Sequence, residues 1–165
     1  MTGRVWLVGA GPGDAGLITV RGRELLGRAD VVVYDRLAGA ELLTLAKPGA
    51  ELIDAFKAPG KHTVPQDEIH DVLIERARAG KEVVRLKGGD PFIFGRGWEE
   101  IEACYLAGVP CVVVPGVSSA IGVPTAAGVP LTLRGQASTV SVVTPSVGRG
   151  LPDRELPYDA MAKMD

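Results

Sequence analysis

The sequence predicts an α/β fold, with an open, mostly parallel five-stranded sheet and helices on both faces. Two observations support this prediction. Short apolar runs alternate five times with helical patterns along the 165 residues, and such alternation is typical of strand–helix–strand units. Glycine (22 residues) and proline (12 residues) are both frequent, which indicates many tight loops between short elements.

The first strand and the first helix follow from local patterns. Residues 5–8 form a short apolar run that predicts a buried strand, and the glycine-rich residues 9–14 come directly after it. The apolar residues at positions 17, 20, 25 and 26 fit a helix that begins at Thr19.

The remaining elements continue this alternation. We expect strands at residues 31–34, 51–56, 81–86 and 112–114, and helices at residues 41–46, 65–79, 99–106 and 120–127. Residues 138–143 alternate in polarity and also predict a strand. Residues 1–147 would then form one α/β domain, and residues 148–165 a linker followed by the start of a helical segment.

The composition excludes several classes of protein. Hydrophobic residues make up 46% and charged residues 23%, as in an ordinary globular protein, and the net charge of −2 gives no reason to expect nucleic-acid binding. No apolar run is long enough to span a membrane and the N-terminus lacks a signal peptide, so a cytoplasmic protein is expected. The two cysteines fit neither a zinc site nor a disulfide framework, and the two histidines lack metal-ligand spacing, so no metal site is predicted.

Polar and glycine-rich segments follow four of the predicted strands, at residues 9–14, 35–36, 88–91 and 115–119. The carboxyl ends of parallel strands meet at one edge of a sheet, and open α/β sheets bind their ligands at that edge. The four segments therefore predict a binding site there.

The segment with the strongest signal surrounds Asp90. Gly88 and Gly89 let a ligand approach the main chain closely, and Arg85, Lys87 and Arg96 place three cations around them, two before the glycines and one after. A tight strand-to-helix connection with solvated charges is the alternative. At the end of the second strand, Asp35 and Arg36 fit either an exposed ion pair of little energetic weight or a carboxylate at the ligand edge.

The loop at residues 9–14 leaves a further alternative open, a nucleotide-binding oxidoreductase. Its Gly-x-Gly-x-Gly pattern is similar to the start of a dinucleotide fingerprint, but the third glycine comes one place early. Pro12 also lacks the N–H that a phosphate cradle would use. The nucleotide hypothesis is therefore weak, and a tight turn that faces another ligand remains open.

Taken together, these segments resemble the uroporphyrinogen-III C-methyltransferases of the tetrapyrrole methylase family. The resemblance covers residues 3–144 and is most specific at residues 85–97. The Tyr-Asp-Arg-Leu and Phe-Gly-Arg-Gly pieces favour the uroporphyrinogen-III enzymes over other tetrapyrrole methylases. The matching pieces are VGAGPGD at residues 8–14, YDRL at 34–37, PQDEI at 65–69, VRLKGGDPFIFGRG at 84–97 and VPGV at 114–117.

The resemblance implies methyl transfer from S-adenosylmethionine to uroporphyrinogen III, giving precorrin-2 and S-adenosylhomocysteine, in siroheme or cobalamin biosynthesis. It implies Asp35 as proton acceptor and Lys57 as proton donor, and it suggests a homodimer. Because arginine forks suit the many carboxylates of the substrate, we expect Arg85, Arg96 and Arg36 to bind them. The expected cofactor contacts are Pro12, Gly88, Gly89, Asp90, Ile93, Ser118 and Ser119.

The sequence departs from the family pattern at several positions. Trp98 stands where glycine is usual, Leu133 where histidine is usual, and Ala58 where arginine is usual. Family members also continue for roughly another hundred residues, about one small domain. The resemblance therefore implies that this chain is an N-terminal portion, in which residues 148–165 are a linker and the start of a truncated second domain. We expect it to be weakly active or inactive alone, because half of an interdomain cleft binds its cofactor weakly. The alternatives are a methyltransferase that acts on another tetrapyrrole, a precorrin, and a non-catalytic dimerisation or binding module.

Overall fold

The computed structural model describes residues 2–55, 65–144 and 155–163. They belong to two compact units, Met1–Ser119 and Ala120–Asp165. The strands are β1 (Arg4–Gly9), β2 (Val31–Tyr34), β3 (Glu51–Asp54), β4 (Glu82–Lys87) and β5 (Cys111–Val114). The helices are α1 (Val20–Leu26), α2 (Ala40–Leu43), α3 (Gln66–Arg78), α4 (Gly97–Leu106), α5 (Ser119–Ala126) and α6 (Tyr158–Met161), with short 3₁₀ turns η1 (Ala15–Leu17) and η2 (Arg36–Ala38).

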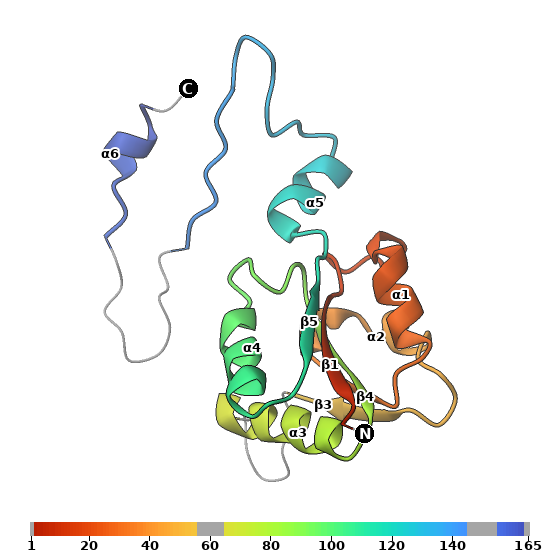
Figure 1. Cartoon of the computed structure of the whole chain (residues 1–165). Coiled ribbons are helices and arrows are strands. Elements are labelled where there is room, and N and C mark those ends of the chain that lie inside the picture. Colours follow the sequence, from red (N-terminus) through yellow and green to blue (C-terminus); the bar gives the residue numbers. More distant parts are fainter. Residues whose placement is uncertain (1, 56–64, 145–154, 164–165) are drawn as a thin grey trace. The chain divides into compact units, whose positions relative to one another are not determined.

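The first unit is built on one sheet of five parallel strands in the order β3-β2-β4-β1-β5 (Figure 1). The strand β4 lies at its centre, where it pairs with β1 and β2. Helices cover both faces of the sheet, because α1 and α2 pack on one side and α3 and α4 on the other. The predicted fold class is therefore confirmed, with all five strands parallel.

Two hydrophobic clusters hold the helices to the sheet, one on each face. Leu26 of α1 and Leu42 of α2 pack against alternate strand residues such as Leu86, and all three are fully buried. On the other face, Leu73 of α3 packs with a second set that includes Val83. Strands buried on both faces read as continuous apolar runs, and this property made them visible in the sequence.

The helix ends follow the expected chemistry. The Thr19 hydroxyl oxygen accepts the backbone N–H of Gly22 at 3.1 Å, so α1 begins where the sequence predicts. The helix α3 carries acidic residues in its first turn and arginines in its last turn, which complements the helix dipole. It ends before Gly80, whose φ of +81° is costly for other residues.

One sequence prediction is wrong. Residues 138–143 were expected to form a strand, but the structure has no strand there, and none of the described strands pairs with this segment. The side chains of Val140, Val142 and Val143 remain about half exposed. Alternating polarity makes a strand only where a neighbouring backbone satisfies its N–H and C=O groups. The boundary predicted at residue 147 lies outside the described residues.

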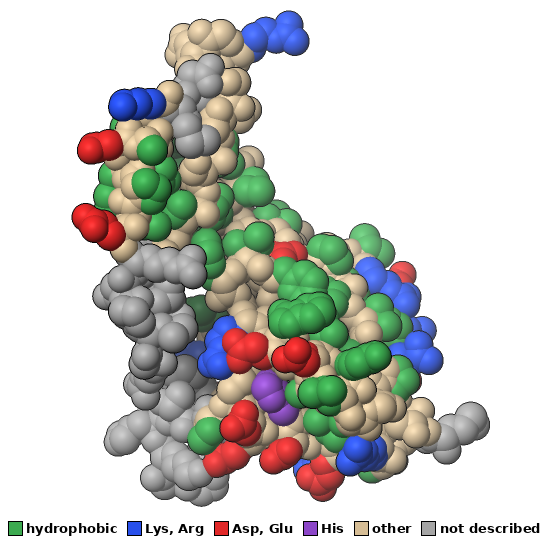
Figure 2. Space-filling model, turned by 60° about the vertical axis from the view of Figure 1, so that its left-hand side comes forward, with side chains coloured by type: hydrophobic (Ala, Val, Ile, Leu, Met, Phe, Trp, Pro, Cys, Tyr) green, Lys and Arg blue, Asp and Glu red, His purple; other side chains and the backbone are tan. Residues whose placement is uncertain are grey.

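Within the described part of the chain, no helix combines the length and the apolar character that crossing a bilayer requires. Figure 2 shows hydrophobic side chains grouped beside several acidic ones on one face of the molecule. Among the exposed hydrophobic side chains are Trp98, Tyr105 and Leu106 of α4.

Candidate active site

The carboxyl edge of the sheet has a switch point between the neighbouring strands β1 and β4, and the loops after these strands surround a region here called the crevice. After β1 the chain continues to α1 on one face, and after β4 it continues to α4 on the opposite face. Open α/β sheets bind their ligands where adjacent strands send their connections to opposite faces. The topology therefore places the loops after β1 and β4 at the point where a ligand is expected.

Three loops are joined at this edge by hydrogen bonds. Gly89 donates its N–H to the carbonyl of Gly11 at 2.8 Å, and Gly11 donates its N–H to the carbonyl of Gly89 at 3.2 Å. One carboxylate oxygen of Asp90 accepts the N–H of Phe92 at 2.8 Å, and the other accepts the N–H of Gly116 at 3.0 Å. Asp90 thus fastens the loop after β4 to the loop after β5.

Glycines make this close approach of three backbones possible. A β-carbon on Gly116 would lie 2.2 Å from the carbonyl oxygen of Gly89 and 2.7 Å from the Cα of Gly9. Gly89 itself has a φ of +63°, which glycine adopts without strain. The result is a short stretch of bare main chain at the crevice.

The structure brings several predicted cofactor residues together here. A β-carbon on Gly89 would lie 3.8 Å from the Cα of Ser118 and 3.9 Å from the N of Ser119. Pro12 follows Gly11 in the loop that pairs with Gly89, and it is half-buried. Gly88 and Asp90 flank Gly89 and are also half-buried, whereas Ile93 is exposed on the same loop.

Asp35 lies at the end of β2, beside the crevice strand β4. Its backbone N–H donates to the carbonyl of Leu86 at 3.0 Å, and its side chain is 32% exposed. One carboxylate oxygen lies 2.5 Å from Nη2 of Arg85, so the ion pair is with this interior arginine. Arg36 is exposed in η2, and Lys57 lies outside the described residues.

A buried charged cluster, formed by Arg85, Lys87 and Glu100, lies behind Asp35. The Oε1 atom of Glu100 accepts from Nε of Arg85 at 2.9 Å and from Nζ of Lys87 at 3.1 Å. Nζ of Lys87 is also 3.0 Å from Oε2 of Glu100 and 4.0 Å from Oδ2 of Asp35. Gln66 of α3 adds a hydrogen bond to Glu100 at 3.2 Å. All three charged side chains of the cluster are buried.

The surroundings raise the pKa of Arg85 and lower the pKa of Lys87. Burial acts to lower the pKa of Arg85, but the attraction of Glu100 and Asp35 outweighs it and holds the pKa above its ordinary value. Burial and the nearby Arg85 charge lower the pKa of Lys87, against the attraction of Glu100 and Asp35. The cluster is therefore held together by its carboxylates.

Arg85 was predicted to bind substrate carboxylates. In the structure only 2% of its side chain is exposed, and its guanidinium fork bonds to Asp35 and Glu100. A role as a substrate contact stays a prediction. Glu100 was missed at the level of sequence, although a signal existed. Arg85 and Lys87 lie two residues apart on a mostly apolar strand, so both point to the same face of the sheet. Buried charges on one face require a counterion.

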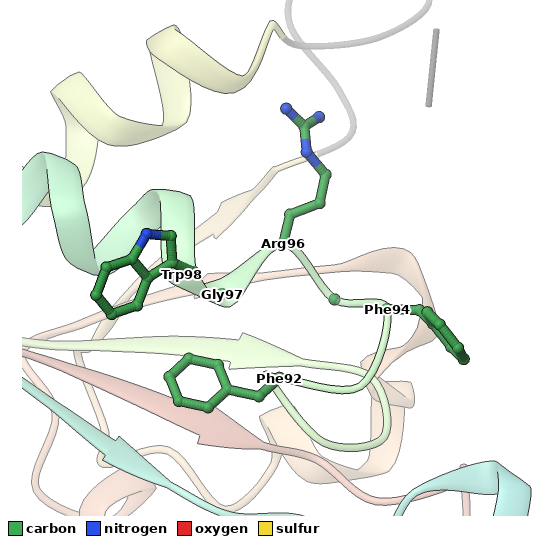
Figure 3. A pocket seen from close by; sticks show the side chains of 6 residues that line it. Phe92, Phe94, Arg96, Gly97 and Trp98 are labelled. Carbon is green, nitrogen blue, oxygen red and sulfur yellow. The ribbon is translucent and has the colours of Figure 1, made fainter. Parts of the chain in front are cut away.

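A small hollow of about 210 Å³ lies along the loop between β4 and α4, lined by Phe92, Phe94, Gly95, Arg96, Gly97 and Trp98. Figure 3 shows the rings of Phe92 and Trp98 on one side of the loop, with Arg96 extending away from both. Arg96 forms a forked ion pair with Glu99, at 2.8 and 2.5 Å.

The backbone of this loop is strained at two positions. Phe94 and Arg96 have φ values of 53° and 54°. This left-handed conformation costs energy for residues with a side chain, and such strained residues are found preferentially at functional sites.

Among the described residues, no group of three or more histidine, cysteine, aspartate or glutamate side chains is arranged to hold a metal ion. The crevice is instead lined by backbone groups, serines and one paired carboxylate.

The sequence pattern of the tetrapyrrole (corrin/porphyrin) methylases matches residues 4–162. This chain belongs to that family.

Individual family members are close in sequence. The chain is 56% identical over 144 residues to a uroporphyrinogen-III C-methyltransferase of Methanocaldococcus jannaschii, covering 87% of this chain and 60% of that protein. It is 52% identical over 160 residues to siroheme synthase 2 of Pectobacterium atrosepticum, covering 97% of this chain and 34% of that protein. The chain thus spans between a third and three fifths of the length of these relatives.

Solved structures of the family have the same fold. The uroporphyrin-III C-methyltransferase from Thermus thermophilus complexed with S-adenyl homocysteine has a TM-score of 0.69 and 49% identity, covering 83% of this chain and 57% of that chain. The cobalt precorrin-4 methyltransferase CbiF has a TM-score of 0.73 and 38% identity, covering 82% of this chain and 55% of that chain.

Proposed function

We propose that this chain takes part in the S-adenosylmethionine-dependent C-methylation of uroporphyrinogen III, with precorrin-2 as the product. Family membership and the names of its close relatives support this proposal. The single observation that carries it is the position of Asp35. A partly exposed carboxylate, fixed by a buried arginine, stands beside the crevice that the glycine loops form.

The cofactor residues suit S-adenosylmethionine, which supplies an electrophilic methyl group when bound. Gly89 has a φ of +63° and carries no side chain, so a bulky ligand can come within contact distance of the backbone there. Ser118 and Ser119 add hydroxyls for a ribose or an amino-acid carboxylate. The chain's main task is alignment, since the reacting sulfonium needs no further activation.

Asp35 and Lys57 handle the proton in this proposal. Methylation of a pyrrole carbon leaves a cationic macrocycle that must lose a proton, and the Asp35 carboxylate can accept it. Lys57 is the proposed proton donor. Arg36 and Arg96 are exposed cations near this edge and can pair with substrate carboxylates, and Arg85 is retained as a third candidate.

A second candidate is methylation of another tetrapyrrole, such as a precorrin. The likeness to CbiF at 38% identity favours it. The substitution of Trp98 at a position where the uroporphyrinogen-III enzymes usually have glycine also bears on substrate choice, because the indole is exposed beside the hollow. Turnover with uroporphyrinogen III and with precorrins as competing substrates would separate the two.

The proposed function is tested by binding and by transfer of a labelled methyl group. We expect the chain to bind S-adenosylhomocysteine in calorimetric titration and not to bind NAD. We expect Asp35→Asn to abolish methyl transfer to uroporphyrinogen III without loss of cofactor binding. The matched control is Asp71→Asn, an exposed carboxylate of α3. Binding of NAD in place of S-adenosylhomocysteine, or full turnover by Asp35→Asn, would contradict the proposal.

A further inference from the structure

Glu100 is a buried carboxylate for which the proposed reaction has so far given no role. It lies in the first turn of α4, and its side chain is fully buried. It contacts three groups from two other elements: Arg85 and Lys87 of β4 and Gln66 of α3. Burying a charge is costly, so its contacts must hold it firmly.

Arg85 connects Glu100 to Asp35. Its Nε donates to Glu100 at 2.9 Å and its Nη2 donates to Asp35 at 2.5 Å, while Nη1 lies 3.4 Å from the carbonyls of Val33 and Leu86. A guanidinium is planar and rigid, so fixing one side of it fixes the direction of the other. The orientation of the Asp35 carboxylate therefore depends on Glu100 through one intervening side chain.

The balance of charges in the cluster explains why loss of the Glu100 carboxylate would disturb Asp35. With Asp35 included, two carboxylates face two cations, and Lys87 lies 4.0 Å from Asp35. Replacing Glu100 by glutamine keeps the volume but leaves both buried cations with the Asp35 carboxylate as their remaining ion-pair partner. Arg85 and Lys87 would then compete for Asp35, and its orientation would change.

We propose that Glu100 is a positioning residue that, through Arg85, holds the Asp35 carboxylate in the orientation needed to accept a proton. This inference rests on the proposed function, in which Asp35 is the acceptor. If Glu100 served stability alone, its replacement would weaken the fold and leave the Asp35 carboxylate where it is.

The first test needs no turnover. In the full chain, the carboxyl carbon resonance of Asp35 is compared by NMR between the wild type, Glu100→Gln and Glu102→Gln. The control residue Glu102 lies on the exposed side of the same helix. We expect the resonance to move in Glu100→Gln and to stay in place in the control. An unchanged resonance in folded Glu100→Gln overturns the inference.

The second test is kinetic. We expect Glu100→Gln to lower kcat roughly 10- to 100-fold, as misplacement of a reacting group by about 1 Å does, with KM within about twofold of the wild type. Combined with Asp35→Asn, it should cause no further loss of any residual methyl transfer, because both changes act on the same proton acceptor. Additive losses, or a fall confined to KM, would overturn the inference.

The outcomes also separate this inference from the proposed function. If Asp35→Asn retains methyl transfer, the proposed function fails. If Asp35→Asn is inactive and Glu100→Gln is as active as the wild type, only the positioning role fails. Should Glu100→Gln not fold, Arg85→Lys tests the same link, since it keeps the charge and removes the fork. It should move the Asp35 resonance and lower kcat in the same way, and a wild-type result overturns the inference.

Discussion

The close approach of three loops at Gly116 leads to a sharp prediction. In Gly116→Ala, the new methyl group would lie 2.2 Å from the carbonyl oxygen of Gly89 and 2.7 Å from the Cα of Gly9. Both contacts are with backbone, so no side-chain rotation can relieve them, and the loops must separate by about 1 Å to restore van der Waals distance. Overpacking of this kind costs about 1–3 kcal/mol. The Gly116–Asp90 hydrogen bond would be disturbed as well.

The matched control is Gly27→Ala. Gly27 has helical backbone angles, and a methyl group there would meet other atoms at 3.6 Å or more. Urea denaturation followed by circular dichroism measures the free energy of unfolding, and calorimetry measures binding of S-adenosylhomocysteine. We expect Gly116→Ala to lose about 1–3 kcal/mol of stability and most of its cofactor affinity, and Gly27→Ala to lose little of either. Equal stability and affinity in the two variants would refute the close approach of these loops.

Three further outcomes are expected. Asp90→Ala removes the acceptor of two loop N–H groups, so cofactor affinity should fall in calorimetry, with a stability loss of about 1–3 kcal/mol. Leu73→Ala in the core should cost about 2–5 kcal/mol in urea denaturation. The hydrogen bond from Lys47, and then that from the Glu82 backbone, lower the pKa of Asp30 below its ordinary 3.8, so its stabilising contribution is present above that value and is lost as pH falls through the lowered pKa. The stability difference between wild type and Asp30→Asn should therefore shrink on going from pH 7 to acid, and a constant difference would contradict the assignment.

Much of the fold could be predicted because its signals are local. Valine-rich runs such as residues 31–34 are buried on both faces, and a parallel sheet needs such strands. The gathering of loops at one edge then followed from geometry, since all carboxyl ends of parallel strands lie together. The alternating residues 138–143 misled because a strand depends on a partner elsewhere, and no local pattern shows whether that partner exists.

The interior of the site could be predicted only in part. The sequence marked Arg85 as a cation near the glycine loop, but it did not show which way the side chain points or that Glu100 meets it from a helix 15 positions further along the chain. Nor did it show that Gly9 and Gly116 touch, because β1 and β5 are neighbours only in the folded sheet. Both contacts join residues that are distant in the sequence, and a single sequence does not show which distant residues touch.

The free-energy cost of burying Arg85, Lys87 and Glu100 bears on the question of why these charged residues are present. Well-packed hydrophobic residues of similar volume would often stabilise a core as well as or better than a buried ion network, because removing charges from water is expensive. The face of the sheet that holds Arg85 and Lys87 is otherwise apolar, with Leu73 and Val83 packed on it. Stability alone therefore does not account for Arg85, Lys87 and Glu100 at this place. A rigid fork that ends on a partly exposed carboxylate does account for them, because an apolar core could not orient Asp35 at the crevice.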